Sequence, residues 1–326
     1  MFRILHDTKY DFIKWWKPSL IIRAVFIIGG LLLLAINRLD FSIEFTGGTM
    51  LQLKFADAPG DAAVRQAVNA AGFEHAEVQQ FGTPTEYTVR VQPRGEVSQA
   101  STDSTRAIIV RALDSQFGAN KVEVLRAEYV GPKVGAELRR NAALAMLAAF
   151  IVTLIYLALR FEWRFGLAAV VANAHEILAT FAFIALMRLE FSLTVLAAIL
   201  TVIGYSLNDT IIIFDRVREN LKKGKKEALR DVVNRSINET LPRSVLTHGT
   251  TLAACLALLF LAGPVLRPFS WIMAFGVITA TFTSIYVSGA LLLWIEHTWP
   301  RTVGETKGMV RARAEERRAA DSMATR

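Results

Sequence analysis

The sequence predicts a polytopic α-helical membrane protein with six transmembrane helices and one α+β domain between the first two. Three observations support this fold class. The chain of 326 residues is 53% hydrophobic. Its mean hydropathy of +0.35 is too high for an ordinary soluble domain of this size. The apolar residues gather in six blocks, and a segment of roughly 100 residues between the first two blocks has a normal soluble composition.

Each block is long enough to cross a bilayer, for which a helix needs about 20 residues and tolerates some tilt. The blocks are residues 19–36, 141–159, 165–187, 191–214, 244–263 and 269–295. The first contains Arg23, whose long side chain we expect to reach the nearer membrane surface. This block also resembles a signal peptide, but it ends without small residues of the A-x-A kind, which favours an uncleaved anchor.

The segment after the first block alternates between strand and helix patterns in the order βαββαβ, which is the order of a ferredoxin-like sandwich. The predicted strands are residues 49–55, 76–81, 86–92 and 122–129, and the predicted helices are residues 61–71 and 101–117. The segment contains no metal-spaced His/Cys set, nucleophile elbow or phosphate-binding loop. We therefore interpret it as a binding or mechanical module.

These elements divide the chain into four parts. Residues 1–37 are a cytoplasmic N-terminus with the first transmembrane helix, 38–140 the extracytoplasmic α+β domain, 141–299 the other five transmembrane helices, and 300–326 a basic cytoplasmic tail. Lys and Arg mark the cytoplasmic flanks of membrane spans. Residues 215–243 carry nine Lys/Arg against five Asp/Glu, and the tail from 301 carries seven against four, so both termini are predicted to be cytoplasmic.

The formal net charge of +8 does not indicate a nucleic-acid partner. The basic residues flank the spans, where solvated loops and contact with anionic lipids account for them. The one cysteine, Cys255, lies within the fifth span and cannot form an intramolecular disulfide. The sequence offers no catalytic motif, metal site or cofactor site, so we expect a protein that is not an enzyme.

Asp209 is the most informative residue, because an ionisable side chain in hydrocarbon costs at least ~2.5–3.5 kcal/mol. It lies beside Asn208 near the end of the fourth span, and we favour a role in a proton or ion path over a carboxylate that reaches the membrane surface. Arg243 lies where the fifth span begins, on the same side of the membrane. The two residues form either a proton-exchanging pair or a static ion pair. His175 and Glu176 in the third span are a second relay point or a polar contact between packed helices.

Three motifs resemble those of SecF, the smaller subunit of the bacterial SecD–SecF complex, which belongs to the RND superfamily. They are LDF at 39–41 followed by FTGGT at 45–49, GYSLNDT at 204–210 followed by FDRVREN at 214–220, and SINETL at 236–241 followed by RS at 243–244. The resemblance covers nearly the whole chain, apart from the first 18 residues and the tail after Trp299.

The resemblance implies a multi-pass accessory subunit of protein export in the bacterial inner membrane, with a periplasmic α+β domain. Such proteins pair with SecD, act beside the SecYEG channel on a translocating polypeptide, and are driven by protons. The family's functional Asp and Arg fall on Asp209 and Arg243, and we place Asn208, Glu176 and His175 with them in a candidate proton relay. The third span departs from the family's usual His-Asp, since Glu176 reaches further than an Asp.

The alternative function is half of a proton-coupled small-molecule exporter of the RND type. Such an exporter needs two six-span halves and two large outer domains, whereas this chain has one of each. A third possibility is a membrane scaffold whose buried polar residues are only structural. An ATP-driven permease would need a nucleotide-binding partner, because the chain has no Walker motif.

Overall fold

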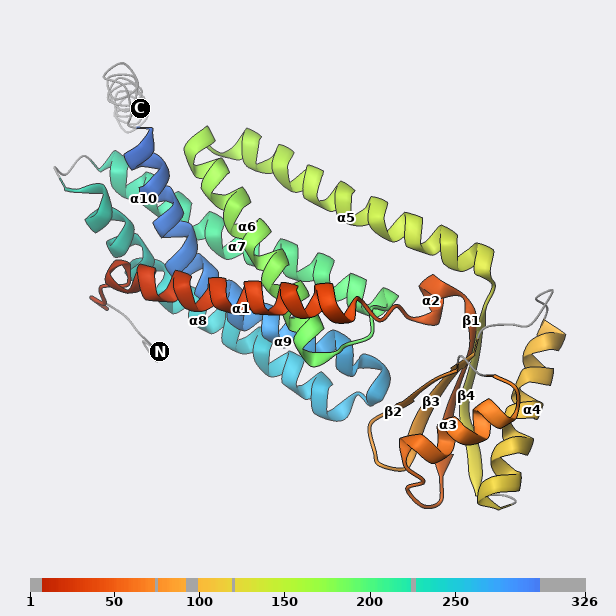
Figure 1. Ribbon diagram of the computed structural model, residues 1–326. Coiled ribbons are helices and arrows are strands. Elements are labelled where there is room, and N and C mark those ends of the chain that lie inside the picture. The colour runs from red at the N-terminus through yellow and green to blue at the C-terminus, as the bar shows by residue number, and fades with distance from the viewer. Residues whose placement is uncertain (1–7, 74–75, 92–98, 119–120, 224–226, 300–326) are drawn as a thin grey trace, which may run out of the picture.

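The computed structural model describes residues 8–73, 76–91, 99–118, 121–223 and 227–299, and shows a helical bundle beside a small sheet domain (Figure 1). Within these ranges, six helical segments are long and apolar enough to cross a membrane. They are α1 (Trp16–Asn37), α5 (Pro132–Arg160), α6 (Trp163–Met187), α7 (Leu193–Lys222), α8 (Leu229–Leu261) and a composite last segment of α9 (Arg267–Phe282), the π-helical η3 (Thr283–Ser288) and α10 (Gly289–Thr298). Short 3-10 turns precede α1 (Ile13–Trp15) and α9 (Pro264–Leu266).

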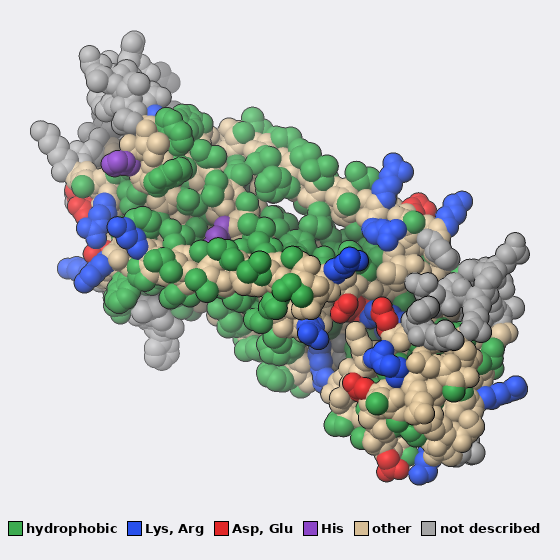
Figure 2. All heavy atoms as spheres, viewed as in Figure 1, with side chains coloured by type: hydrophobic (Ala, Val, Ile, Leu, Met, Phe, Trp, Pro, Cys, Tyr) green, Lys and Arg blue, Asp and Glu red, His purple; other side chains and the backbone are tan. Residues whose placement is uncertain are grey.

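The bundle has two distinct ends (Figure 1). The end that meets the sheet is called the domain end, and the opposite end, where α1 begins and α10 finishes, is called the tail end. Between the two ends the visible surface is largely hydrophobic (Figure 2). Exposed large apolar side chains of the membrane helices include Ile22, Leu159, Phe260 and Leu261. The predicted tail 300–326 lies outside the described residues.

All six predicted spans coincide with helices, but three helices are much longer than predicted. Helix α5 begins at Pro132, so residues 132–140, which the sequence predicts to be part of the α+β domain, form its first turns. Helix α7 continues to Lys222 and α8 begins at Leu229, so most of segment 215–243 is helical where the sequence predicts solvated loops. The reason is that these extensions are amphipathic. Val217 on α7 and Val232 and Val233 on α8 are buried in one apolar cluster, while the charged residues face outwards.

The sheet domain follows α1 through the short helix α2 (Ile43–Thr46). Its elements are β1 (Gly48–Phe55), α3 (Asp61–Ala70), β2 (Glu77–Gln80), β3 (Glu86–Val91), α4 (Gln99–Phe117) and β4 (Val122–Val130), in the predicted order βαββαβ. The strands form one antiparallel sheet in the order β2-β3-β1-β4. Alternate strand residues such as Leu51, Leu53 and Val89 are buried with Val64 of α3 and Ile109 of α4, so both helices cover the same face.

Helices α1 and α6 pack closely at Gly30. A Cβ atom added to Gly30 would lie 2.2 Å from the Cβ of Ala182 on α6, so no side chain fits there. Small residues let two helix backbones approach in this way. Arg23 lies about two turns earlier on α1. The close packing therefore also brings Arg23 against α6.

Gly30→Ala should force α1 and α6 apart and lower the stability of the bundle by about 1–3 kcal/mol, the usual cost of overpacking. Gly29→Ala is the matched control, because nothing lies within 4 Å of a Cβ atom at Gly29. Ala favours a helix more than Gly does, so this control should be neutral or slightly stabilising. Thermal unfolding of the purified protein in mild detergent measures both effects, and equal melting temperatures for the two variants would contradict the packing argument.

Candidate functional site

Asp209 is buried at the centre of three helical segments. It lies on α7 and is 4% exposed. Its Oδ1 accepts a hydrogen bond from Ser244 Oγ of α8 at 2.5 Å, and its Oδ2 accepts one from Ser284 Oγ of η3 at 2.5 Å. Short O–H···O contacts are typical of hydrogen bonds to a carboxylate. In the described part of the chain, no Lys or Arg forms an ion pair with Asp209. Both oxygens are therefore held by hydroxyl groups.

Glu176 is the second buried carboxylate, and it has a cationic partner. It lies on α6 and is 1% exposed. Its Oε2 accepts hydrogen bonds from Arg23 Nη2 of α1 at 2.9 Å and from Thr283 Oγ1 of η3 at 2.5 Å, and its Oε1 accepts one from Thr279. Arg23 also donates to Thr283 Oγ1 at 2.8 Å, and its guanidinium lies 5.3 Å from the Phe282 ring centroid. The result is a closed buried ion pair.

Consecutive residues of η3 contact both carboxylates. Thr283 binds Glu176, and Ser284, the next residue, binds Asp209. Ser288 ends the same segment and donates to the Ser284 backbone oxygen at 2.6 Å. A π-helix is rare and is frequently found at functional sites. Here the π-helical segment connects the ion pair between Arg23 and Glu176 with the hydroxyl groups around Asp209.

His248 lies one turn after Ser244 on α8 and is also buried. Its Nδ1 is 2.8 Å from Thr281 Oγ1, and its ring centroid is 5.1 Å from that of Tyr205 on α7. Tyr205 Oη donates to Thr247 O at 3.2 Å. These contacts extend the polar centre along the interface of α7 and α8.

The pairing expected between Asp209 and Arg243 is not formed in this structure. Arg243 is exposed, and no described contact joins it to Asp209. The reason is helix phase: consecutive residues are about 100° apart around a helix at 3.6 residues per turn. Ser244, which follows Arg243, faces the bundle interior and makes the contact with Asp209 instead. Asn208 is exposed for the same reason, as the neighbour of inward-facing Asp209.

His175 is half-buried beside Glu176, and its Nδ1 has no hydrogen-bond partner among the described residues. Asn173, three residues before Glu176 on α6, likewise has both side-chain polar atoms buried without a described partner. Arg23 is the functional candidate that the sequence prediction missed, since it is not at the surface but paired with Glu176. A charged residue inside a span is the same signal that identifies Asp209.

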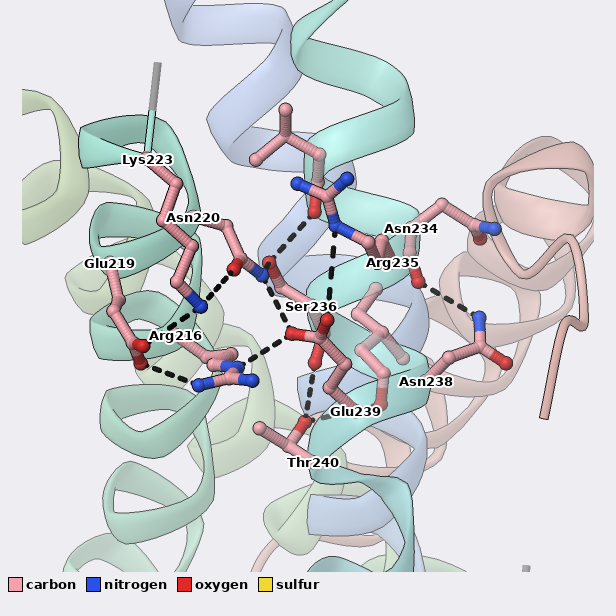
Figure 3. Close-up of polar contacts among 12 residues, drawn as sticks. Arg216, Glu219, Asn220, Lys223, Asn234, Arg235, Ser236, Asn238, Glu239 and Thr240 are labelled. Atoms are coloured by element: carbon pink, nitrogen blue, oxygen red, sulfur yellow. Dashed lines mark hydrogen bonds and ion pairs between the residues drawn. The ribbon is translucent and has the colours of Figure 1, made fainter. Parts of the chain in front are cut away.

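At the tail end, α7 and α8 are joined by a group of side chains that we call the tail-end clamp: Arg216, Asn220, Ser236 and Glu239 (Figure 3). Glu239 Oε2 accepts from Arg216 Nε at 2.6 Å and from Asn220 Nδ2 at 2.7 Å. Asn220 Nδ2 also donates to Ser236 Oγ at 3.0 Å. A cavity of about 640 Å³ adjoins the clamp, and Pro242 lines it. The clamp lies roughly two turns beyond Asp209 along α7.

Comparison with known proteins assigns the chain to a family. The C-terminal model of the SecD/SecF protein export membrane proteins matches residues 110–298, and the SecD/SecF GG motif matches residues 32–58. The chain is 57% identical over 305 residues to the protein translocase subunit SecF of Gemmatimonas aurantiaca, covering 92% of this chain and 91% of that one. It is 38% identical over 308 residues to the SecF subunit of Vibrio alginolyticus, covering 93% and 96%.

Solved structures agree with this result. The crystal structure of SecDF, a translocon-associated membrane protein from Thermus thermophilus, matches 91% of this chain with a TM-score of 0.81 and 35% identity. A SecDF structure in a super-membrane-facing form matches with a TM-score of 0.63 and 33% identity. This chain spans 40% and 41% of the length of those two SecDF chains. The six spanning helices and these matches define a multi-pass membrane protein of the SecD/SecF class. Within that class, the chain belongs to the SecF family of protein translocase subunits.

Arg23→Gln should destabilise the protein by about 3–5 kcal/mol, because it leaves the Glu176 carboxylate buried without its partner. Adding Glu176→Gln should recover much of that loss, since two neutral amides replace the pair. Thermal unfolding in detergent measures the single variants and the double variant as one mutant cycle. A double variant that is as unstable as the sum of the two single variants would show that Arg23 and Glu176 act independently.

Proposed function

We propose that this chain is an accessory subunit of the Sec protein-export machinery. Together with a SecD partner and beside SecYEG, it uses the proton-motive force to promote translocation or release of a polypeptide on the periplasmic side of the inner membrane. The proton relay is centred on Asp209. The family assignment supports the role in export, and the geometry of the two buried carboxylates supports the role of the proton.

The difference between the partners of the two carboxylates carries the proposal. Arg23 neutralises Glu176 in a buried ion pair, whereas the hydrogen-bond partners of Asp209 among the described residues are the hydroxyl groups of Ser244 and Ser284. A serine hydroxyl can donate to a carboxylate, and it can also rotate and accept from a carboxylic acid. The two hydroxyl groups can therefore form hydrogen bonds with the Asp209 side chain whether or not it carries a proton. An Arg partner cannot do this, because a guanidinium only donates.

The exposed polar residues around the centre support a partner subunit at this face. Arg243 and Asn208 are both exposed on the membrane helices of the isolated chain. A charge that faces lipid is costly, so such residues normally face protein or water. We assign this face to the SecD partner, where Arg243 and Asn208 complete the relay, with His175 and Glu176 as its second polar point. SecDF chains more than twice as long as this one are consistent with a partner of similar size.

The sheet domain has the mechanical rather than the chemical role in this proposal. Its order βαββαβ and its sheet order β2-β3-β1-β4 support a ferredoxin-like fold on the periplasmic side. The described residues contain no group of three or more His, Cys, Asp or Glu that could hold a metal ion. The positively charged flanks favour cytoplasmic termini, which puts the tail-end clamp on the cytoplasmic side. No observation favours a small-molecule exporter over this function.

Asp209→Asn should abolish the stimulation of export by a proton-motive force. Asn has nearly the same shape and still forms hydrogen bonds, but it has no carboxylate that could bind and release a proton. Each charge that crosses a 100 mV potential supplies ~2.3 kcal/mol, so a cycle without protons loses its energy source. The measurement is export of a precursor polypeptide into vesicles that contain the variant, its SecD partner and SecYEG, with and without an imposed proton gradient.

Asp215→Asn is the matched control for this experiment. Asp215 lies on the same helix but is partly exposed, and its carboxylate pairs with Arg160 at 2.5 Å. Its replacement should leave the stimulation intact. If a stably assembled Asp209→Asn complex exports at the normal rate under a proton gradient, Asp209 has only a structural role and the proposed mechanism is wrong.

A further inference from the structure

The sheet domain meets the bundle next to the first residue of α7. The linker after α1 and the linker between α6 and α7 form a parallel β-bridge at Phe41 and Phe191. Ser42 N donates to Phe191 O at 3.0 Å. Beside this bridge, Glu44 Oε2 accepts from Leu193 N at 2.6 Å. Glu44 thus binds one of the free N–H groups at the start of α7, where a negative charge is favourable.

Arg90 connects this junction to the sheet. It lies on β3 and is 7% exposed. Its Nη1 donates to Glu77 Oε2 of β2 at 3.1 Å and to Phe41 O at 3.3 Å, and its Nη2 forms an ion pair with Glu190. Glu190 directly precedes Phe191 of the bridge. One guanidinium therefore joins two strands of the sheet to both linkers.

The buried carboxylate of Glu190 depends on Arg90 to compensate its negative charge. Burial raises the pKa of Glu190 above its ordinary value of 4.5, Arg90 acts in the opposite direction, and Glu44 and Glu77 act in the same direction as burial. The carboxylate is therefore partly desolvated, with two acidic neighbours and one basic neighbour. When one member of such a pair is reversed, two like charges are left together with little water around them, which is strongly unfavourable.

Helix α7 does not adjoin the sheet domain along the sequence. The sheet domain is covalently continuous with α1 on one side and with α5 on the other. Helix α7 comes much later in the sequence, and among the described residues side-chain and bridge contacts attach it to the sheet. Asp209 lies 16 residues after Leu193 on the same helix, which is roughly 24 Å at 1.5 Å per residue.

We propose that Arg90 and Glu190 are positioning residues that couple α7 to the sheet domain, so that a displacement of α7 moves the sheet. The coupling rests on the proposed function, because α7 is the helix that carries the proton site. A helix that is hydrogen-bonded from Leu193 to Asp209 either moves as a unit or bends. The ion pair passes the movement of its first turn to β3 and, through Glu77, to β2.

Charge reversal tests the coupling. Spin labels at exposed Lys54 and Leu261, in a Cys255→Ala background, report the distance between the sheet and the bundle by pulsed EPR in lipid nanodiscs. The unmodified pair should give one narrow distance distribution. Arg90→Glu alone and Glu190→Arg alone should each lower the docked population about tenfold or more, because like charges then face each other. The combined exchange, Arg90→Glu with Glu190→Arg, should recover part of the docked population, because opposite charges then face each other again while the contacts of Arg90 with Glu77 and Phe41 O stay lost.

The same variants, assembled with SecD and SecYEG, are then compared in export under a proton gradient. Each single reversal should lower the stimulation and the combined exchange should recover part of it, which a merely weakened fold would not do. The matched control exchanges Arg126 and Glu128, which pair with each other within β4 of the same sheet. This control should change neither the distance nor the export.

Two results would overturn the coupling. One is a narrow distribution and normal export in the single reversals. The other is a combined exchange that stays undocked although it melts at the same temperature as the unmodified protein. Failure of the proposed function looks different, because normal export by Asp209→Asn would refute the proton role while the distance measurement would still test the contact between Arg90 and Glu190.

Discussion

A charge buried in an apolar bundle needs a partner, and this constraint arranges the membrane helices around two carboxylates. Glu176 accepts hydrogen bonds from Arg23 of α1 and from two threonines of the last helical segment. Asp209 accepts hydrogen bonds from one serine of α8 and one of η3. The contacts of the two groups therefore involve five of the six spanning segments. The remaining one, α5, has most of its surface exposed and packs mainly beside α2 and α6.

The two carboxylates have opposite electrostatic roles. The Glu176 pair is complete, because Arg23 supplies its charge and three donors fill its oxygens. Replacing one member of such a pair costs far more than the pair contributes to stability. Asp209 has hydrogen bonds from two hydroxyl groups, and no Lys or Arg in the described part of the chain forms an ion pair with it. A fixed pair and an uncompensated group, linked by consecutive residues of one π-helical segment, are a suitable arrangement for a change of charge that has a structural consequence.

Composition and periodicity predicted what is local and missed what depends on neighbours in space. The six spans, the βαββαβ order and the burial of Asp209 and Glu176 follow from apolar blocks and from alternation along the chain. The partner of Glu176 could not be predicted, because it depends on which helix lies beside α6. Apart from the family resemblance, Arg243 was assigned to Asp209 from its depth in the membrane. Depth does not fix the direction of a side chain, and a shift of one residue gives the contact to Ser244 instead.

Helix extension and the π-helical segment escaped prediction for a different reason. Polar residues dominate the last turns of α7 and the first turns of α8, so hydropathy places the membrane boundary inside each helix and not at its end. The π-helical residues Thr283–Ser288 carry hydroxyls, which in a sequence are equally consistent with an ordinary α-helix. Only the two carboxylates on neighbouring helices show why hydroxyl groups are needed at consecutive positions.

Helix α7 is restrained at three levels, and this limits how it can respond to a proton. At the domain end its first N–H binds Glu44. At the tail end Arg216 and Asn220 bind α8. Between them, a Cβ atom at Gly276 of α9 would lie 2.3 Å from a methyl group of Val202, so α7 and α9 are in close contact there. A shift at Asp209 therefore cannot be absorbed by loose packing. It has to be shared with η3 through Ser284, or carried along α7 to the junction with the sheet domain.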